Sequence, residues 1–155
     1  DENTPIGEIE NLLANGGFEE ADRNGSVRGW FSYGTVIMDY DKSAAHGGVV
    51  SVRIGKSDGL VQHVEVEGGK LYTLAHWTRA LRPEQYARLQ VNWLDRNQRI
   101  VDVSIDVIRV DDKWTWNKMS VTAPNNAAVA QIYVSVHEGS EVWFDDVSFV
   151  EGAME

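Results

Sequence analysis

Short runs in which apolar and polar residues alternate, separated by turn signals, follow one another along nearly the whole chain. In residues 131–137, an apolar set at Ile132, Val134 and Val136 alternates with polar and aromatic side chains. Because neighbouring side chains of a strand point to opposite faces, this period of two indicates strands with one buried face. We count nine or ten such runs, including one over residues 31–41, with no convincing helical period. The pattern predicts an all-β fold, an antiparallel β-sandwich or barrel.

The length of 155 residues is typical of one domain that can bury enough surface to fold without disulfides. No internal repeat, linker or low-complexity tract interrupts the alternating pattern. We therefore expect a single β-sandwich domain over residues 9–151. A polar lead-in or linker at residues 1–8 and a short tail at residues 152–155 would flank it.

Acidic residues dominate the charge, with 24 Asp and Glu against 14 Lys and Arg and a formal net charge of −10. Nucleic acids and anionic lipids favour basic surfaces, so neither is an expected partner. No apolar run approaches the roughly 20 residues that span a bilayer, so membrane insertion is not expected. Cysteine is absent, which excludes disulfides, thiolate metal ligands and a cysteine nucleophile. This composition fits a neutral ligand or a cation.

Two adjacent acids, Asp145 and Asp146, interrupt the apolar run at residues 141–150. If this run is a strand, one of the two carboxylates points inward, where an unpaired charge is costly. Backbone N–H groups or the guanidinium of Arg53 would offset that cost. The period alone does not say which acid points inward.

Three motifs follow one another along the chain: Asn-Gly-x-Phe-Glu at residues 15–19, Ala-His-x-Gly-x-x-Ser-x-Arg at residues 45–53 and Phe-Asp-Asp-Val-Ser at residues 144–148. Together they resemble the galactose-binding-like jelly-roll domains, and most closely the carbohydrate-binding modules of families four, sixteen and twenty-two. The resemblance covers nearly the whole chain. It implies a jelly-roll β-sandwich that binds a polysaccharide or oligosaccharide on a concave sheet face without acting on it. β-Glucan or xylan is the first ligand class that it suggests.

The resemblance also implies a structural Ca²⁺ where the first strand, the following turn and the last strand meet. Carried over to this sequence, Glu19 and Asp146 would supply carboxylates, and the backbone carbonyls from Ala45 to Gly48 would supply further oxygens. Ca²⁺ prefers a mixture of these two ligand types. Asp145 in place of Asp146 is one alternative, and an inward acid that only accepts backbone N–H groups is the other.

Sugar rings stack on aromatic side chains, and their hydroxyls pair with planar polar groups, so a polysaccharide site should combine the two. If Leu74 points to the core, the strand period places Trp77 and Arg79 on an outer, concave face. The same period groups polar and aromatic side chains on later strands, and Trp114 lies in a polar loop. The expected binding residues are Trp77, Arg79, Gln90, Asn92, Tyr133, His137 and Trp114, whereas Trp30 and Trp93 are expected in the core and Tyr33 is expected to pack.

The resemblance implies an ancillary module of a larger secreted or cell-surface bacterial protein, fused to a catalytic domain that it targets to substrate. A structural or interaction β-sandwich without a sugar site is an alternative. A small jelly-roll glycoside hydrolase or lyase is another, and a hydrolase would need two converging carboxylates. Asp102 and Asp106 share one strand face, as do Glu65 and Glu67, but alternating acids are usual on a solvated strand.

Overall fold

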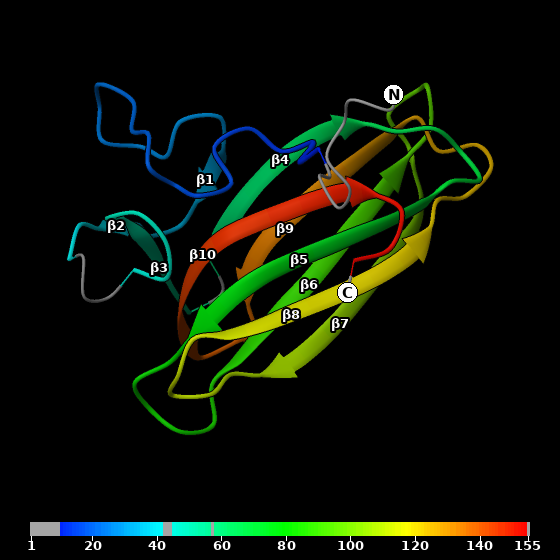
Figure 1. The fold of residues 1–155 in the computed structure, drawn as a ribbon. Coiled ribbons are helices and arrows are strands. Elements are labelled where there is room, and N and C mark those ends of the chain that lie inside the picture. The colour runs from blue at the N-terminus through cyan, green and yellow to red at the C-terminus, as the bar shows by residue number, and fades with distance from the viewer. Residues whose placement is uncertain (1–9, 42–44, 57, 155) are drawn as a thin grey trace, which may run out of the picture.

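Two antiparallel five-stranded β-sheets face each other and form a sandwich (Figure 1). The computed structural model describes residues 10–41, 45–56 and 58–154. The first sheet has the order β1-β4-β9-β6-β7, with strands Phe31–Tyr33, Gly59–Glu65, Val129–Val136, Tyr86–Leu94 and Ile100–Arg109. The second sheet has the order β2-β3-β10-β5-β8, with strands Val36–Asp39, Ser51–Lys56, Ser140–Glu151, Leu71–Arg79 and Thr115–Thr122.

These described residues form no helix, which confirms the all-β prediction. It follows that none of them belongs to a helix that is long and apolar enough to cross a membrane. The lead-in expected at residues 1–8 lies outside the described ranges.

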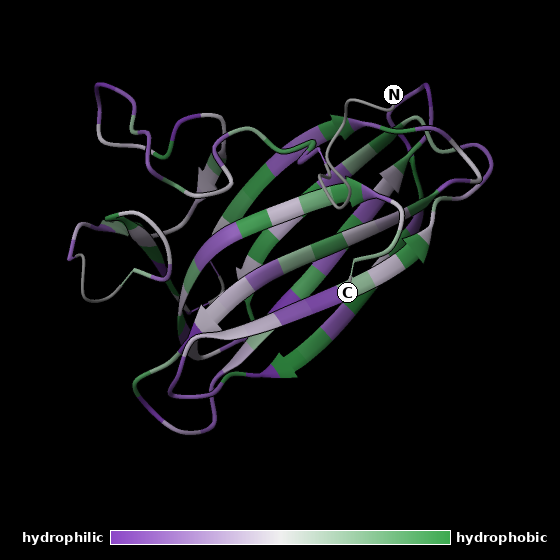
Figure 2. Ribbon diagram, in the orientation of Figure 1, coloured by the Kyte–Doolittle hydropathy of each residue, from purple (hydrophilic) through white to green (hydrophobic). Residues whose placement is uncertain are grey.

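The alternation in the sequence becomes the two faces of each sheet, as the bands of hydropathy along the strands show (Figure 2). Leu89, Val91 and Trp93 of β6 point between the sheets and are buried, as are Leu74 of β5 and Phe144 of β10. Burying a side chain of this size stabilises the fold by about 1.5–3 kcal/mol. Trp30 and Trp93 are both buried, so their predicted place in the core is confirmed.

The run at residues 31–41 was expected to form one strand, and this prediction is wrong. It splits into β1, which pairs with β4 in the first sheet, and β2, which pairs with β3 in the second. Gly34 separates the two strands with a φ of 72°, a left-handed conformation that favours glycine. The bend carries the chain from one sheet to the other, and it places β1 beside the outer face described below.

The segment before β1 lies against β10 and is held there by hydrogen bonds to the backbone of β10. The amide of Asn11 donates to the carbonyl of Val147, and Phe149 N–H donates to Asn11 Oδ1. Val147 N–H donates to the carbonyl of Gly16 at 2.8 Å. A Cβ at Gly16 would collide with the Val147 carbonyl oxygen, so this approach requires glycine. The contact brings the segment that carries Glu19 next to the part of β10 that carries Asp146.

Candidate functional site

A groove of about 940 Å³ lies on the outer face of the first sheet, over β1, β4, β9 and β6. Its floor is formed by the side chains that alternate with the core residues of these strands. In register, Gln90 of β6 lies beside Tyr133 of β9, and Asn92 lies beside Gln131. Ten residues line the groove: Gly29, Phe31, Tyr33, Val61, Gln62, His63, Arg88, Gln90, Gln131 and Tyr133.

Side-chain amides on the groove floor form a continuous hydrogen-bonded ladder. Gln90 Nε2 donates to Asn92 Oδ1 at 3.0 Å, and Asn92 Nδ2 donates to Gln131 Oε1 at 3.1 Å. Gln131 Nε2 lies 3.0 Å from His63 Nε2 at the far end. Each amide has two donor hydrogens and an oxygen with two acceptor positions, and these bonds use only part of that capacity. The amide ladder (Gln90, Asn92 and Gln131) therefore presents fixed donors and acceptors to a ligand.

Aromatic side chains border the amide ladder on one side. Tyr33 and Tyr133 pack edge to face, with ring centroids 6.3 Å apart, and Phe31 beside them is 71% exposed. Burial is the main reason that the pKa of the Tyr33 phenol is raised, so this hydroxyl stays protonated at neutral pH. Tyr33 thus lines the groove as well as packing against Tyr133.

Aliphatic side chains border the ladder on the other side, at the edge strand β7. Val103 and Ile105 of β7 are in register with Asn92 and Gln90 of β6 and are about half exposed. The groove therefore combines a polar floor with apolar borders, which suits a ligand with hydroxyl edges and apolar faces.

The structure brings four of the seven expected binding residues to this face: Gln90, Asn92, Tyr133 and His137. His137 follows β9 at the rim, where its Nδ1 lies 3.3 Å from Nη2 of Arg88. The sequence analysis missed Arg88, Gln131 and His63. Their signal is the period of two, because Arg88 is in phase with Gln90 and Gln131 is in phase with Tyr133.

The other three expected residues, Trp77, Arg79 and Trp114, lie on the opposite face of the sandwich. Trp77 and Arg79 belong to β5 and are in register with Asp145 and Trp143 of β10, in the second sheet. Arg79 lies over the ring of Trp114, 5.8 Å from its centroid. The expectation that all seven residues share one face is therefore wrong. The period of two gives the face of a strand but not the sheet to which the strand belongs.

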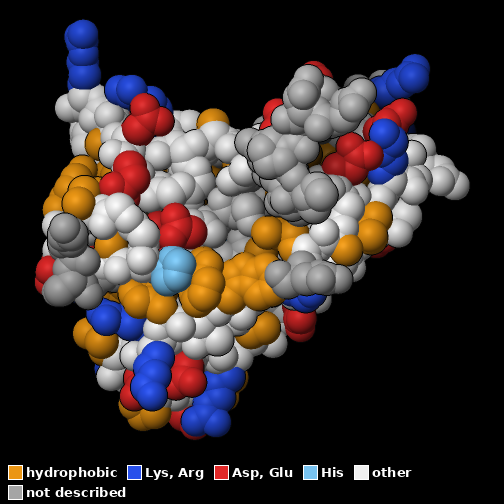
Figure 3. All heavy atoms as spheres, viewed as in Figure 1, with side chains coloured by type: hydrophobic (Ala, Val, Ile, Leu, Met, Phe, Trp, Pro, Cys, Tyr) orange, Lys and Arg blue, Asp and Glu red, His pale blue; other side chains and the backbone are white. Residues whose placement is uncertain are grey.

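His46 covers Trp77 on this opposite face. The two rings are stacked, with centroids 3.8 Å apart, and Trp114 meets His46 edge to face at 5.8 Å. Figure 3 shows this side of the molecule, where a histidine lies beside hydrophobic side chains over β10 and β5. Trp77 is thus engaged in packing on one side of its ring. Whether Trp77, Arg79 and Trp114 contact sugar stays a prediction.

Of the two adjacent acids, Asp145 is the one whose side chain is buried. Its side chain is on the outer side of β10, opposite the core residue Phe144, but the turn at residues 45–48 buries it completely. Asp145 Oδ2 accepts N–H groups from His46 and Gly47, each at 3.0 Å, and Oδ1 accepts that of Asp146 at 2.8 Å. Burial nevertheless raises the pKa of the Asp145 carboxyl to about 6. Backbone N–H groups, and not Arg53, are therefore the partners of the buried acid.

The residues expected to hold calcium lie together at the same turn. Both carboxylate oxygens of Glu19 accept N–H groups, from Val49 at 2.9 Å and Val50 at 3.0 Å. Asp146 Oδ2 lies 2.6 Å from His46 Nδ1. A Cβ at Gly47 would meet the Asp146 carboxylate, and a Cβ at Gly48 would meet that of Glu19. The two carboxylates thus lie over adjacent glycines, and a residue with a Cβ at either position would collide with one of them.

Side chains alone do not make a metal centre here, since no group of three or more His, Cys, Asp or Glu within the described ranges is arranged to hold an ion. A calcium site at this turn would need backbone oxygens, such as those of Ala45 and Gly48, beside Glu19 and Asp146. Both adjacent acids face this turn: Asp145 accepts its N–H groups, and the Asp146 carboxylate lies against Gly47.

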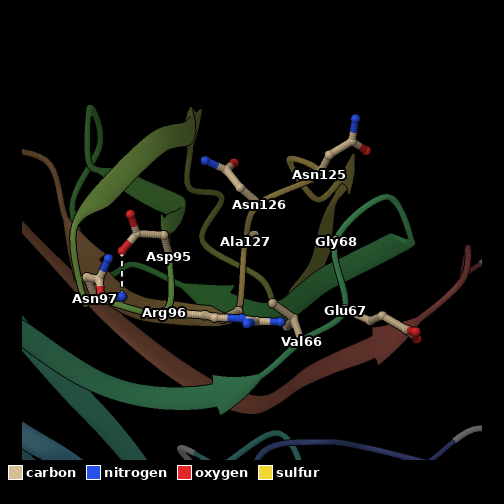
Figure 4. A pocket seen from close by; sticks show the side chains of 10 residues that line it. Val66, Glu67, Gly68, Asp95, Arg96, Asn97, Asn125, Asn126 and Ala127 are labelled. Atoms are coloured by element: carbon tan, nitrogen blue, oxygen red, sulfur yellow. Dashed lines mark hydrogen bonds between the residues drawn. The ribbon is translucent and has the colours of Figure 1, made fainter.

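Another hollow, of about 630 Å³, lies between the loops at one end of the sandwich (Figure 4). Asn125 and Asn126 point away from each other, and Glu67 points out of the hollow (Figure 4). Asp95 is engaged in its own turn, where Oδ1 accepts the N–H groups of Asn97 and Arg99. The polar side chains of this hollow do not converge as those of the groove do, so the groove is the candidate site.

Comparison with known families identifies the chain. The family model described as a carbohydrate binding domain (CBM_4_9) matches residues 10–141. The chain belongs to this family and is a carbohydrate-binding module. No curated protein matches the sequence.

Solved structures share the fold at low sequence identity. Family 16 Carbohydrate Binding Module-2 is 22% identical, with a TM-score of 0.64 over 91% of this chain and 100% of that chain. The CBM22-1 xylan-binding domain of Paenibacillus barcinonensis Xyn10C is 19% identical, with a TM-score of 0.64 over 95% and 97%. The enzymatically active domain of bacteriophage CBA120 tailspike protein 4 is 17% identical, with a TM-score of 0.71 over 92% of this chain. This chain spans only 21% of the tailspike chain. The similarities confirm the predicted jelly-roll fold.

Proposed function

We propose that the groove on the first sheet binds a polysaccharide chain and that the module does not act on it chemically. The observation that carries this proposal is the amide ladder, held in one conformation between aromatic and aliphatic borders. The amides would pair with hydroxyls at the edges of the sugar rings. Tyr133, Tyr33 and Phe31 would contact the apolar ring faces. Xylan or β-glucan is the first ligand to test, and the xylan-binding domain of similar fold supports that choice.

The lining of the groove supports a role in binding rather than in hydrolysis. A glycoside hydrolase of the usual kind needs two carboxylates on either side of the scissile bond. None of the ten lining residues is Asp or Glu. Asp102 and Asp106 are in register with the core residues Trp93 and Leu89, so they lie on the side of β7 that faces away from the groove.

The module would act by tethering. Linked to a catalytic domain of a secreted or cell-surface protein, it would raise the effective concentration of substrate at that domain. The similarity to about a fifth of a chain described as an enzymatically active domain supports such a fusion. The acidic charge of the module is compatible with neutral polysaccharides, which need no basic surface.

Calcium would tie the N-terminal segment to β10. Glu19 and Asp146 supply carboxylates, and Ala45 and Gly48 supply backbone oxygens, which are the ligand types that Ca²⁺ prefers. Support comes from the two glycines that let both carboxylates approach the same turn. The ion would stabilise the fold, since the turn lies on the second sheet and not in the groove.

Affinity electrophoresis tests the proposal directly. The protein would be run through gels that contain xylan, β-glucan, mannan, galactan or agar, each with and without EDTA. Retardation by one class is expected, and Gln131→Ala should remove it while the melting temperature changes little. A chain that migrates freely in every gel would instead be a structural or interaction domain. Release of reducing ends from a retained polysaccharide would contradict the non-catalytic role.

A further inference from the structure

The groove carries positive charge in a strongly acidic protein. Acids outnumber Lys and Arg by 24 to 14, yet the lining includes Arg88 and His63 and no Asp or Glu. His137 adds a second imidazole at the rim, beside Arg88. The charge balance of the whole chain is therefore reversed at this one surface.

Arg88 has no carboxylate partner among the residues that the structure describes. The ion pairs there involve Arg28, Lys70, Arg109 and His46. Among the described residues, the Arg88 side chain has one hydrogen-bond partner, the imidazole of His137 at Nη2, and its Nε is buried without one. A buried donor without a partner is costly, so the head group of Arg88 has an unmet need for an acceptor.

The polar groups beside Arg88 have other partners. Ser135 of β9 is in register with Arg88 of β6, and its buried hydroxyl is close enough to the Tyr33 phenol to act on it through a hydrogen bond. Asp58 also acts on that phenol and is engaged as well, because its Oδ2 accepts the N–H of Thr35 at 2.6 Å. The unmet donor of Arg88 thus lies at one end of the groove, while the amide ladder at the other end is well bonded.

The missing partner has a definite chemistry. A guanidinium forms its strongest hydrogen bonds with carboxylates and phosphates, often through two parallel N–H groups. In a polysaccharide, a carboxylate is supplied by a uronic acid. We propose that the groove binds a polysaccharide that carries uronic acid groups, with one carboxylate held by Arg88. This proposal rests on the binding function of the groove and specifies its ligand.

Binding requires a small rearrangement. The Nε of Arg88 is covered in this structure, so the guanidinium must turn about its terminal bonds towards the ligand. Only one hydrogen bond, the contact of 3.3 Å to His137, opposes that motion. The neighbouring amide ladder would stay in place and position the sugar ring by its hydroxyls.

Matched oligosaccharides test the inference by isothermal titration calorimetry. One pair is a xylo-oligosaccharide with a single glucuronic acid branch and the same compound with its carboxylate reduced to an alcohol. The other is an oligogalacturonate and its reduced form. Short ligands limit repulsion from the net charge of the protein. The acidic form of one pair should bind about tenfold more tightly than its reduced form, the effect of a charge-assisted hydrogen bond, and the preference should shrink as salt is added.

Substitutions link that preference to Arg88. Arg88→Gln should abolish the preference, so that this variant binds the acidic and the reduced oligosaccharide with equal affinity. Arg99→Gln, which removes the same charge from the exposed turn between β6 and β7, is the matched control and should keep the preference. Melting curves of both variants would establish that they fold.

Three results would overturn the inference. The first is equal binding of the acidic and reduced forms in both pairs. The second is a preference that Arg88→Gln retains, and the third is a lack of binding to either pair although a neutral polysaccharide is retained in the gels. In each of these cases the binding function of the groove would stand. If no polysaccharide of any kind is retained, both proposals fail together.

Discussion

The hydroxyl of Tyr133 donates a hydrogen bond of 3.0 Å to Oε1 of Gln131, two residues earlier on the same face of β9. The same oxygen accepts the amide of Asn92 from β6, so both of its acceptor positions are used. The amide nitrogen of Gln131 faces His63 of β4. Gln131 is therefore held from three directions, and its orientation does not have to be fixed when a ligand binds. Such preorganisation reduces the entropic cost of binding.

Removing the Tyr133 hydroxyl should loosen Gln131 and weaken binding. Tyr133→Phe keeps the ring for contact with a sugar face but removes the bond to Gln131. A net hydrogen bond contributes about 0.5–1.5 kcal/mol, so we expect a loss of roughly twofold to tenfold in affinity. Calorimetry with the retained polysaccharide would measure it. Unchanged affinity would mean that the orientation of Gln131 does not matter to the ligand.

Two substitutions decide which face of the sandwich binds sugar. Tyr133→Ala should abolish retention in affinity gels, because Tyr133 borders the amide ladder. Trp77→Ala should keep retention and lower the melting temperature, since it removes the ring on which His46 stacks, a contact that contributes about 0.5–1.5 kcal/mol. The opposite pattern would assign the site to Trp77, Arg79 and Trp114.

The alternation of residue types predicted the fold and placed four of the expected residues on one sheet face, for one physical reason. A period of two states which side chains share a face, so Tyr133 and His137, or Gln90 and Asn92, could be grouped from the sequence alone. Strand order depends on contacts between residues far apart in the chain. The period therefore could not show that β5 lies in one sheet and that β6 and β9 lie in the other.

Irregular backbone limited the rest of the prediction. Gly34 turns the chain between sheets within a run that alternates like one strand. A bulge between Asp145 and Ser148, with a φ of 47° at Asp146, likewise breaks the alternation of β10. Both acids can therefore approach the turn at residues 45–48 from adjacent positions, which a regular strand would not allow.

The buried imidazole of His76 should make stability depend on pH. His76 lies in the core against Phe144, and burial lowers its pKa to about 4. In the unfolded chain the pKa is about 6.5, so between these values the unfolded state binds a proton that the folded state does not. The free energy of unfolding should therefore fall as pH decreases through this window, by about 2 kcal/mol between pH 7 and pH 5.

Urea unfolding of the protein and of His76→Gln at both pH values would isolate this effect. Asp145 titrates in the same range with the opposite sign, because its raised pKa makes the folded state gain stability as pH falls. That contribution is present in both proteins and cancels when their pH dependences are subtracted. Equal pH dependences in the two proteins would show that His76 titrates normally.

Calcium should raise the melting temperature through Glu19 and Asp146. An ion that binds only the folded state at 100 times its dissociation constant adds about 2.7 kcal/mol, which corresponds to roughly 5–10 °C for a chain of this size. EDTA should reverse the shift, and Mg²⁺ should not replace Ca²⁺, since it binds backbone oxygens less readily. Scanning calorimetry with each ion would measure these differences.

Glu19→Ala distinguishes a calcium ligand from a purely structural carboxylate. Glu19 already accepts N–H groups from Val49 and Val50, so its removal should lower the melting temperature even in EDTA. Only a ligand would also abolish the difference between calcium and EDTA. Glu138→Ala, at an exposed loop position, is the control and should keep that difference. A melting temperature that does not respond to calcium in the unsubstituted protein would leave Glu19 with the N–H groups as its only partners, and the turn would be held without a metal.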